Sequence, residues 1–303
     1  MNVKTHFSIK DLENLSGIKA HTIRIWEKRY NLLDPNRTKT NIRKYDIDNL
    51  KKILNVAFLY NEGYKISKIA DLESSQITEL INNQTENKQK NFSLNSFKTA
   101  MLSFDSSLFS KTYNELEQHY SFRDIFFKVF IPFLTEIGVL WQTGTIDPAH
   151  EHFVSELIKQ KIILNIEQVQ PNHTPQKDVL FSLFLPYKEI HDIGLLYAHY
   201  EVLNAGFKTI YLGANIPLES LKYVLRHHDN IIFLSYLTIK PEKQTFDAYI
   251  QSFTENVCTH KSCDLWLIGN KTEEIQSDKT PSHIKLFPSL KEFILEVEKL
   301  KKS

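Results

Sequence analysis

A histidine that follows a carboxylate and precedes a glycine is the part of this sequence best suited to chemistry. Glu189, His191 and Gly194 come just after a short apolar run, Val179–Leu185, with the spacing Glu-x-His-x-x-Gly. The neutral imidazole of His191 can present one ring nitrogen to a metal, while the carboxylate of Glu189 accepts the other ring N–H and fixes the tautomer. Gly194 permits close approach of a bulky ligand. The alternative is an ordinary solvated loop histidine.

A second group of residues is less informative by itself. Trp141 is followed, after nine residues, by Glu151 and His152. A tryptophan on a helix packs in a core more often than it covers a cofactor, and Glu-His pairs are common on surfaces. These residues gain a chemical meaning only from a resemblance described below.

A third group of candidate residues, which could bind nucleic acid, depends on two short helices near the N-terminus. Ser8 can cap a helix from Lys10 to Leu15, and Ser16-Gly17-Ile18 provides a tight turn. A second helix is predicted from about Lys19 to Arg29. Two short helices joined by a glycine-containing turn are typical of a helix-turn-helix.

The second helix has an apolar and a polar side. Ile23 and Trp26 form the buried side. The outward side chains, which can reach phosphates or base edges in a major groove, are His21, Thr22, Arg24 and Lys28. A basic hairpin over residues 35–45 follows, with room for a wing, and the residues there that could bind the phosphate backbone are Arg37, Lys39, Arg43 and Lys44.

Charge is distributed unevenly along the chain. Residues 1–70 carry 14 Lys and Arg against 7 Asp and Glu, whereas the remainder carries 23 basic and 29 acidic residues. A basic module suits the neutralisation of phosphates, and an acidic remainder does not.

The chain is long enough for several domains. We predict a DNA-binding domain over residues 1–73, a polar linker over 74–91, a bundle of about four helices over 92–170, and an α/β domain over 178–303. Helical periodicity is clear in the third segment, for example in Phe126, Phe127, Phe130, Ile131 and Leu134.

The α/β segment alternates apolar strands with amphipathic helices. The predicted strands are Val179–Leu185, Thr209–Leu212, Ile231–Leu237, Leu265–Ile268 and Ile284–Phe287. The predicted helices are Asp192–Ala205, Leu218–His228, Lys243–Val257 and Ser289–Lys301, with a weaker segment near Thr272–Asp278. This order predicts a doubly wound parallel sheet, whose ligand crevice lies at the carboxyl ends of the strands.

The N-terminal pattern resembles the MerR family of winged helix-turn-helix regulators across about 65 residues. The segments that carry the resemblance are FSIKDLENLSGIKAHTIRIWEKRYNLL and NIRKYD. The resemblance implies a homodimer that reads promoter DNA with the second helix and holds phosphates with the wing. The implied DNA contacts are Lys19, His21, Thr22, Arg24, Lys28, Arg37, Arg43 and Tyr45.

The remaining motifs resemble cobalamin-binding proteins. Glu-x-His-x-x-Gly in a flavodoxin-like domain is similar to the motif in which an acid orients the lower histidine ligand of cobalt, here His191. The helical bundle resembles the cap over adenosylcobalamin, with Trp141, Glu151 and His152 around the upper face. The implied contacts of the nucleotide tail are Ser235, Leu237 and Gly269.

Taken together, the chain resembles the CarH/LitR class of light-responsive MerR-type repressors. Two positions depart from that pattern. Asn270 stands where a second glycine is expected, and Gln142 stands where a histidine follows the cap tryptophan.

The resemblance implies a transcriptional repressor whose oligomeric state and DNA affinity respond to adenosylcobalamin and to light, with a dimer or tetramer as the assembly. No residue need catalyse a reaction. Two alternatives remain open. The cobalamin-like domain could be degenerate and serve only oligomerisation or a protein partner. The chain could instead be a corrinoid methyl-transfer component, against which the basic head argues.

Composition limits the other classes. No apolar run is long enough for a transmembrane helix, and residues 1–10 lack the apolar core of a secretory signal. We therefore expect a cytoplasmic protein without a membrane partner. Cys258 and Cys263 are expected to be ordinary thiols in a reducing compartment.

Overall fold

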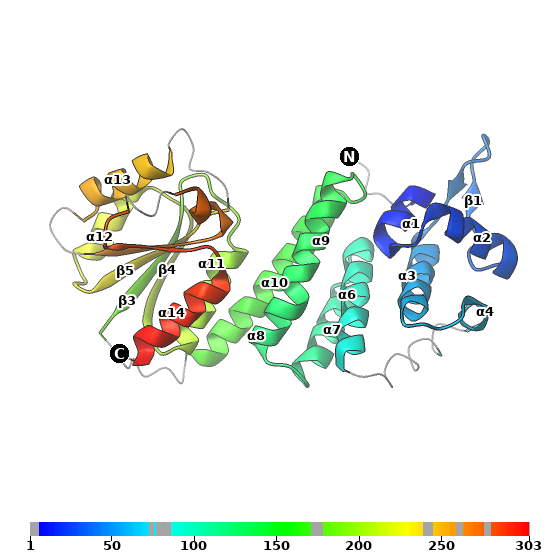
Figure 1. Ribbon diagram of the computed structural model, residues 1–303, viewed down its shortest axis with the longest axis horizontal. Coiled ribbons are helices and arrows are strands. Elements are labelled where there is room, and N and C mark those ends of the chain that lie inside the picture. The colour runs from blue at the N-terminus through cyan, green and yellow to red at the C-terminus, as the bar shows by residue number, and fades with distance from the viewer. Residues whose placement is uncertain are drawn as a thin grey trace. The chain divides into compact units, whose positions relative to one another are not determined.

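The computed structural model describes residues 6–72, 76, 86–170, 178–238, 245–258, 263–275 and 280–302, without the side chains of residues 86–92. The chain divides into two compact units, Met1–Leu157 and Ile158–Ser303, and each is described by itself (Figure 1). Within the described ranges, no helix combines the length and apolar character needed to cross a bilayer.

A small helical head opens the first unit. Its elements are α1 (Ile9–Ser16), α2 (Ala20–Tyr30), β1 (Asn36–Arg37), β2 (Arg43–Lys44), α3 (Ile47–Asn61) and α4 (Ile66–Ile69). The predicted cap is confirmed, because Ser8 Oγ accepts a hydrogen bond from Asp11 N while the Asp11 carboxylate accepts one from Ser8 N. Gly17 ends α1 with a φ of 74°, which glycine adopts without steric cost.

The buried side of the head agrees with the sequence pattern. Ile23 and Trp26 on α2 are 0% and 4% exposed. They share the core with Leu12 of α1 and Leu50 of α3, which are also buried. Strands β1 and β2 pair antiparallel, so residues 36–44 form a two-stranded hairpin.

Helices make up the rest of the first unit. The elements are α6 (Glu86–Ser103), α7 (Ser106–Glu117), α8 (Phe122–Ile125), η1 (Phe126–Phe130), α9 (Ile131–Gln142) and the start of α10 (Pro148–Val169). Stacked and tilted phenylalanine rings fill their core; Phe97 lies 4.7 Å from Phe109 and 5.8 Å from Phe133, between ring centroids. The helical pattern of this segment is therefore confirmed.

The predicted linker over 74–91 is partly helical. Helix α6 begins at Glu86, so residues 86–91 belong to it. Apart from Gln76 and these six residues, the predicted linker lies outside the described residues. Polar composition predicted a linker here, but it does not exclude a helix, because Glu, Lys and Gln are polar residues that favour helices.

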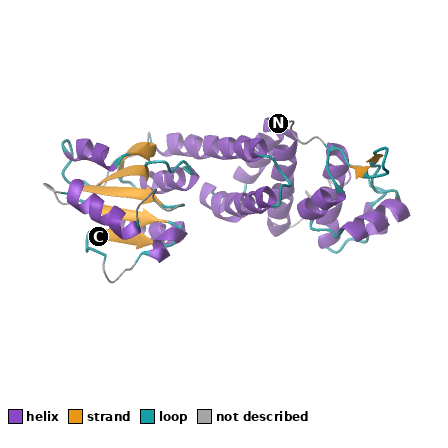
Figure 2. Cartoon of the chain, turned by 90° about the horizontal axis from the view of Figure 1, so that it is seen from above, coloured by secondary structure: helices purple, strands orange, loops and turns teal. Residues whose placement is uncertain are grey.

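A five-stranded parallel sheet and the helices around it form most of the second unit (Figure 2). After the end of α10, the elements of this unit are β3 (Leu180–Pro186), α11 (Ile193–Asn204), β4 (Lys208–Ile216), η2 (Leu218–Ser220), α12 (Leu221–Leu225), β5 (Ile231–Tyr236), α13 (Phe246–Asn256), β6 (Asp264–Ile268), η3 (Asn270–Glu274), β7 (Ile284–Phe287) and α14 (Leu290–Lys302). The strand order is β4-β3-β5-β6-β7, with every neighbouring pair parallel. The predicted parallel sheet is confirmed.

The three central strands of the sheet, β3, β5 and β6, are buried on both faces, whereas edge strand β4 is partly exposed. Helices α12 and α13 cover one face, where Phe233 and Phe253 belong to the core cluster, and α11 packs with α14 near the other (Figure 1). Because parallel strands end at the same edge, the loop from β3 to α11 lies at the carboxyl edge of the sheet. That loop contains His191.

The two cysteines form a disulfide, so the expectation of ordinary thiols is wrong for this structure. Cys258 follows the end of α13 and Cys263 precedes β6, and their Cα atoms are 5.8 Å apart. Helix α13 and strand β6 contribute to the same core cluster, through Phe253 and Leu265, so the residues next to them can approach each other. Sequence spacing alone does not contain this information.

Candidate functional site

The predicted DNA-contacting residues of the second helix share one surface. Lys19, His21, Arg24 and Lys28 are exposed on α2 or just before it. Thr22 is half-buried, and its Oγ1 lies 3.3 Å from Nε2 of His21. The surface therefore presents cationic and hydroxyl groups on the side of α2 away from its core.

Glu27 connects this helix to the hairpin. Its carboxylate accepts two hydrogen bonds from Arg43 Nε, at 2.9 and 3.2 Å, and one from the Tyr45 hydroxyl at 3.0 Å. Arg37 lies 3.9 Å away and donates to Asn41 at 2.9 Å. The contacts fix the hairpin relative to α2. Sequence reasoning placed Glu27 in the family pattern but gave it no role.

Two predicted DNA contacts, Tyr45 and Arg43, take part in the network around Glu27, and only Tyr45 is fully buried by it. Tyr45 is 0% exposed, so its side chain cannot reach DNA, and that prediction is corrected by its burial in the head. Burial and the hydrogen bond to Glu27 raise the pKa of Tyr45. The hydrogen bond to Glu27 also raises the pKa of Arg43, whose side chain is 30% exposed. Arg43 is thus held by Glu27 while part of it remains accessible to phosphate.

The Glu189–His191 pair has the geometry that the sequence pattern predicts. His191 Nδ1 lies 2.7 Å from Glu189 Oε1, and the same oxygen accepts the backbone N–H groups of Ile190 and His191 at 2.8 and 2.9 Å. The Glu189 side chain is 4% exposed, whereas that of His191 is 55% exposed. Because Nδ1 is held by Glu189, Nε2 is the ring nitrogen available to a ligand.

Two further contacts hold the loop that carries this pair, and sequence reasoning missed both. Lys159 on α10 lies 2.9 Å from the Asp192 carboxylate. Asn215 Oδ1 at the end of β4 accepts the Lys188 backbone N–H at 2.8 Å, and Lys188 has a φ of 68°. No local signal could have found these partners, since they come from other elements.

His191 alone suits a metal ion whose other ligands come from a cofactor. Within the described ranges, no group of three or more His, Cys, Asp or Glu side chains could hold a metal ion. A single exposed imidazole, oriented by a buried carboxylate, can supply one axial ligand to a metal in a macrocycle.

The predicted glycines are packed closely. A Cβ at Gly194 would lie 2.7 Å from the ring of Tyr236, and a Cβ at Gly269 would lie 2.5 Å from the carbonyl oxygen of Leu237. Gly269 also has a φ of 122°. Both glycines are therefore required by packing at the carboxyl edge of the sheet, whether or not a ligand approaches them.

The predicted tail-binding residues lie at the same edge. Ser235 is fully buried near the end of β5, and its hydroxyl has no hydrogen-bond partner in the described part of the chain. Leu237 is 1% exposed. Asn270, which departs from the family pattern, is exposed at the start of η3. Its side chain is therefore not part of the buried core.

The predicted upper-face residues flank one connection of the first unit. Trp141 lies at the end of α9 and is 53% exposed. Glu151 is half-buried and His152 exposed in the first turns of α10. The connection between them is anchored by buried Thr145, whose Oγ1 accepts a hydrogen bond from Asn14 of α1 at 3.0 Å.

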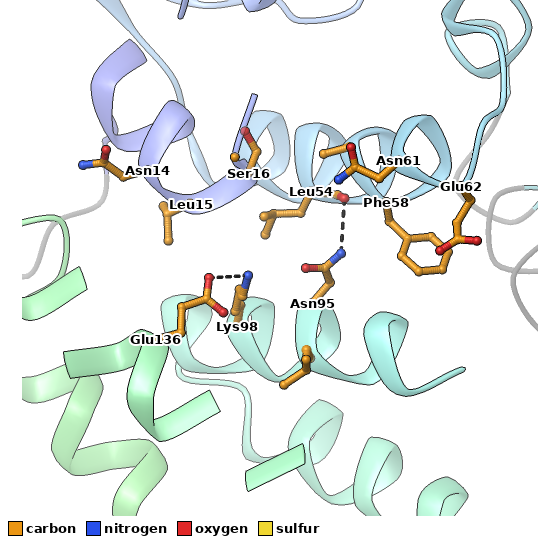
Figure 3. Close-up of a pocket in the computed structure, with 13 residues that line it drawn as sticks. Asn14, Leu15, Ser16, Leu54, Phe58, Asn61, Glu62, Asn95, Lys98 and Glu136 are labelled. Carbon is orange, nitrogen blue, oxygen red and sulfur yellow. Dashed lines mark hydrogen bonds and ion pairs between the residues drawn. The ribbon is translucent and has the colours of Figure 1, made fainter. Parts of the chain in front are cut away.

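A pocket of about 310 Å³ lies between the head and the helices of the first unit (Figure 3). Asn14 and Leu54 lie on its head side, while Lys98 and Glu136, 2.6 Å apart, lie on α6 and α9. Asn95 points toward the Leu54 carbonyl at 3.5 Å. This contact surface is partly polar and incompletely packed.

Comparisons with known protein families match the head and the helices that follow it. Residues 7–76 match the family described as MerR HTH family regulatory protein, and residues 93–164 match the family described as B12 binding domain. The second match covers the helices and not the sheet.

Two curated relatives come from Myxococcus xanthus. The HTH-type transcriptional repressor CarH is 26% identical over 222 residues, which cover 71% of this chain and 73% of that protein. The HTH-type transcriptional repressor CarA is 22% identical over 240 residues, 78% of each chain.

Among solved structures, the Methanosarcina barkeri monomethylamine corrinoid protein has a TM-score of 0.48 and 12% identity, over 70% of this chain and 94% of that one. The family matches and the two relatives support a CarH-like regulator, in which a segment similar to the MerR helix-turn-helix precedes a segment similar to B12-binding domains.

Proposed function

We propose that this chain is a DNA-binding transcriptional repressor whose DNA affinity responds to cobalamin. The observation that carries the proposal is the Glu189–His191 pair, in which a buried carboxylate orients an exposed imidazole at 2.7 Å. A regulator, rather than an enzyme, is supported by the MerR-type head. We further propose the adenosyl form of the cofactor and cytoplasmic localisation.

The residues of the second unit fit a corrinoid. Glu189 holds His191 with Nε2 available as a lower ligand, and the partnerless hydroxyl of Ser235 is suited to a polar tail. His191 would hold the cobalt of a bound cobalamin through Nε2, and the cofactor would supply the metal centre that the protein lacks. Lys159 and Asp192 position the loop, since their ion pair lies next to His191 in the chain.

We propose the helices over 92–170 as a four-helix cap. Exposed Trp141, with Glu151 and His152, would cover the upper ligand and exclude water from it. Gln142 is exposed beside Trp141 and offers a weaker metal ligand than the histidine of the resembled class. We therefore do not extend the proposal to light-driven capture of the metal.

We propose the hairpin over 36–44 as a wing. In this arrangement α2 enters a major groove with Thr22, Arg24 and Lys28, while Arg37 and Arg43 contact phosphates. Glu27 pre-organises the wing through its contacts with both arginines. A homodimer or homotetramer would join several heads on promoter DNA and raise affinity by multivalency.

The first test is an absorption spectrum. The full chain is mixed in the dark with adenosylcobalamin, desalted and scanned, beside the variant His191→Ala. The wild-type chain is expected to retain the corrinoid with its dimethylbenzimidazole displaced by His191, and the variant to lose this spectrum and bind at least 10-fold more weakly. Equal spectra for both chains would contradict the proposal.

DNA binding is tested on the same samples. Gel shifts with the chain's own promoter region and with random DNA, across a salt series, are expected to give a steep salt slope. Arg24→Ala should weaken binding, whereas Lys222→Ala on exposed α12 is the matched control. Absence of any DNA binding at low salt would contradict the proposal that the chain is a DNA-binding regulator. A DNA affinity that adenosylcobalamin leaves unaltered would contradict the proposed response to cobalamin.

A further inference from the structure

An exposed isoleucine lies among the candidate DNA contacts of α2. Ile25 is 53% exposed, whereas Ile23, two residues earlier, is fully buried. Because a helix has about 3.6 residues per turn, a step of two residues carries a side chain to nearly the opposite side. Ile25 therefore points away from the core of the head, although its side chain is as apolar as that of Ile23.

The neighbours of Ile25 on this surface are polar or basic. His21 lies four residues before it and Lys28 three residues after it, and these are the spacings at which side chains are neighbours on a helix. Arg24, directly before it, and Arg29, four residues after it, are exposed as well. Groups that can bind phosphates or base edges thus flank the apolar side chain on several sides.

The chemistry of this surface determines what can cover Ile25. Exposed cations suit a polyanion, whereas an apolar protein surface would cover Arg24 and Lys28 without neutralising them. Isoleucine has no hydrogen-bond donor or acceptor in its side chain, so it cannot bind a phosphate or the polar edge of a base. In the major groove, the apolar group that a base pair presents is the C5-methyl group of thymine.

We propose that Ile25 selects thymine in the operator by contact with its C5-methyl group in the major groove. The inference rests on the proposed function, because it requires α2 to enter that groove. Another base at this position would present polar groups, and isoleucine cannot replace the hydrogen bonds that those groups make to water. Ile25 is thus a specificity-determining residue, and it acts beside the hydrogen-bonding side chains of Arg24 and Lys28.

The test removes the methyl group without changing base pairing. The wild-type chain first selects its preferred sequence from a random DNA library, in the dark with adenosylcobalamin. That fragment is then amplified once with dTTP and once with dUTP, so that the two products differ only in C5-methyl groups. Gel shifts measure the affinity of the wild-type chain and of Ile25→Ala for both products.

The measured quantity is the ratio of the two affinities for each chain. The wild-type chain is expected to bind the uracil product roughly 4-fold more weakly for each head that binds, the value of one buried methyl group. For Ile25→Ala the two affinities should agree within about 2-fold. Comparing the ratios of the two chains cancels any effect of uracil on the shape of the DNA itself.

Ile42→Ala is the matched control. Ile42 is 60% exposed at the turn of the hairpin, so this variant loses the same apolar surface outside α2. It should keep the wild-type ratio, and Ile25→Val, which retains a branched apolar side chain, should keep most of it. Since both isoleucines are exposed, hydrogen exchange of the α2 amides is expected to match the wild type in all three variants.

The outcomes separate this inference from the proposed function. Equal ratios for the wild-type chain and Ile25→Ala would overturn the thymine contact, as would a selected sequence without thymine, while DNA binding would stand. If the wild-type chain bound no DNA at low salt, the proposed function would fail and the thymine contact with it. A ratio lost in Ile42→Ala as well would assign the effect to the whole head and overturn the role of Ile25.

Discussion

Two carboxylates, half-buried Glu27 and buried Glu189, organise the two regions of this protein in different ways. In the head, Glu27 is surrounded by Arg43, Tyr45 and Arg37, and its side chain is 11% exposed. In the second unit, Glu189 is 4% exposed and binds two backbone N–H groups and His191. Both acids orient a neighbour that carries nitrogen donors.

The difference lies in what each acid leaves accessible. Arg43 uses its Nε on Glu27, and Tyr45 is buried, so the Glu27 centre is mainly a structural clamp. His191 uses one ring nitrogen on Glu189 and exposes more than half of its side chain. A carboxylate–nitrogen pair therefore indicates a ligand site only where a second donor remains accessible.

The largest effect is expected from Glu27→Ala. This change removes the shared acceptor of Arg43 and Tyr45 and leaves the Tyr45 hydroxyl buried without it. We expect a loss of about 2–3 kcal/mol in the free energy of unfolding of the head and the loss of DNA binding. Hydrogen exchange of the backbone amides of α2 and α3 in the full chain measures it.

Glu13→Ala is the matched control for that change, because Glu13 pairs only with lysines at the surface in the contacts that the described residues show. Its hydrogen exchange is expected to change little. If Glu27→Ala behaved like the control, the clamp interpretation of the head would be wrong.

A pH dependence of similar size is expected from a buried histidine in the second unit. His199 on α11 is 7% exposed, its Nε2 lies 2.9 Å from Thr209 Oγ1, and burial lowers its pKa to about 4. The unfolded chain binds this proton near pH 6.5. Stability from His199 is thus complete above pH 6.5 and is lost as pH falls to 4, by up to about 3 kcal/mol.

Urea midpoints of the second unit between pH 4 and 7 measure this dependence against the variant His199→Gln. The variant is expected to have a shallower slope, while His228→Gln, an exposed control, keeps that of the wild type. Parallel slopes for all three chains would show that His199 is not the titrating group.

The smallest effect on stability is expected from Glu189→Gln. The amide oxygen can still accept the backbone N–H groups of Ile190 and His191, so the unfolding free energy should change by less than about 1 kcal/mol. The affinity for adenosylcobalamin should nevertheless fall by roughly 10- to 100-fold, because the neutral amide orients and polarises His191 less strongly. A titration in the dark measures it, and an unchanged affinity would make Glu189 a purely structural residue like Glu27.

Local patterns accounted for most elements. All five strands of the second unit were predicted within a few residues, because each is a short apolar run bounded by polar turns. The turn at Gly17 and the cap at Ser8 were equally readable, since caps depend on residues three apart. Helix α12 is shorter than the predicted helix Leu218–His228. The short helix η2 takes the place of its first turn, and α12 ends at Leu225.

Non-local contacts were not readable in the same way. Glu27 meets Arg43 and Tyr45 across 16 and 18 residues, and sequence reasoning had assigned Tyr45 to DNA. The ion pair between Lys159 and Asp192 joins two elements that share no pattern.

By itself, the sequence determined the kinds of elements, their order, and the oriented imidazole of His191, because these depend on neighbours within about four residues. Only the tertiary structure decided which groups are enclosed. It buried Tyr45, joined Cys258 to Cys263, and enclosed the hydroxyl of Ser235 without a hydrogen-bond partner among the described residues. The physical reason is that burial and hydrogen-bond partnership belong to surfaces that segments far apart in the chain form together.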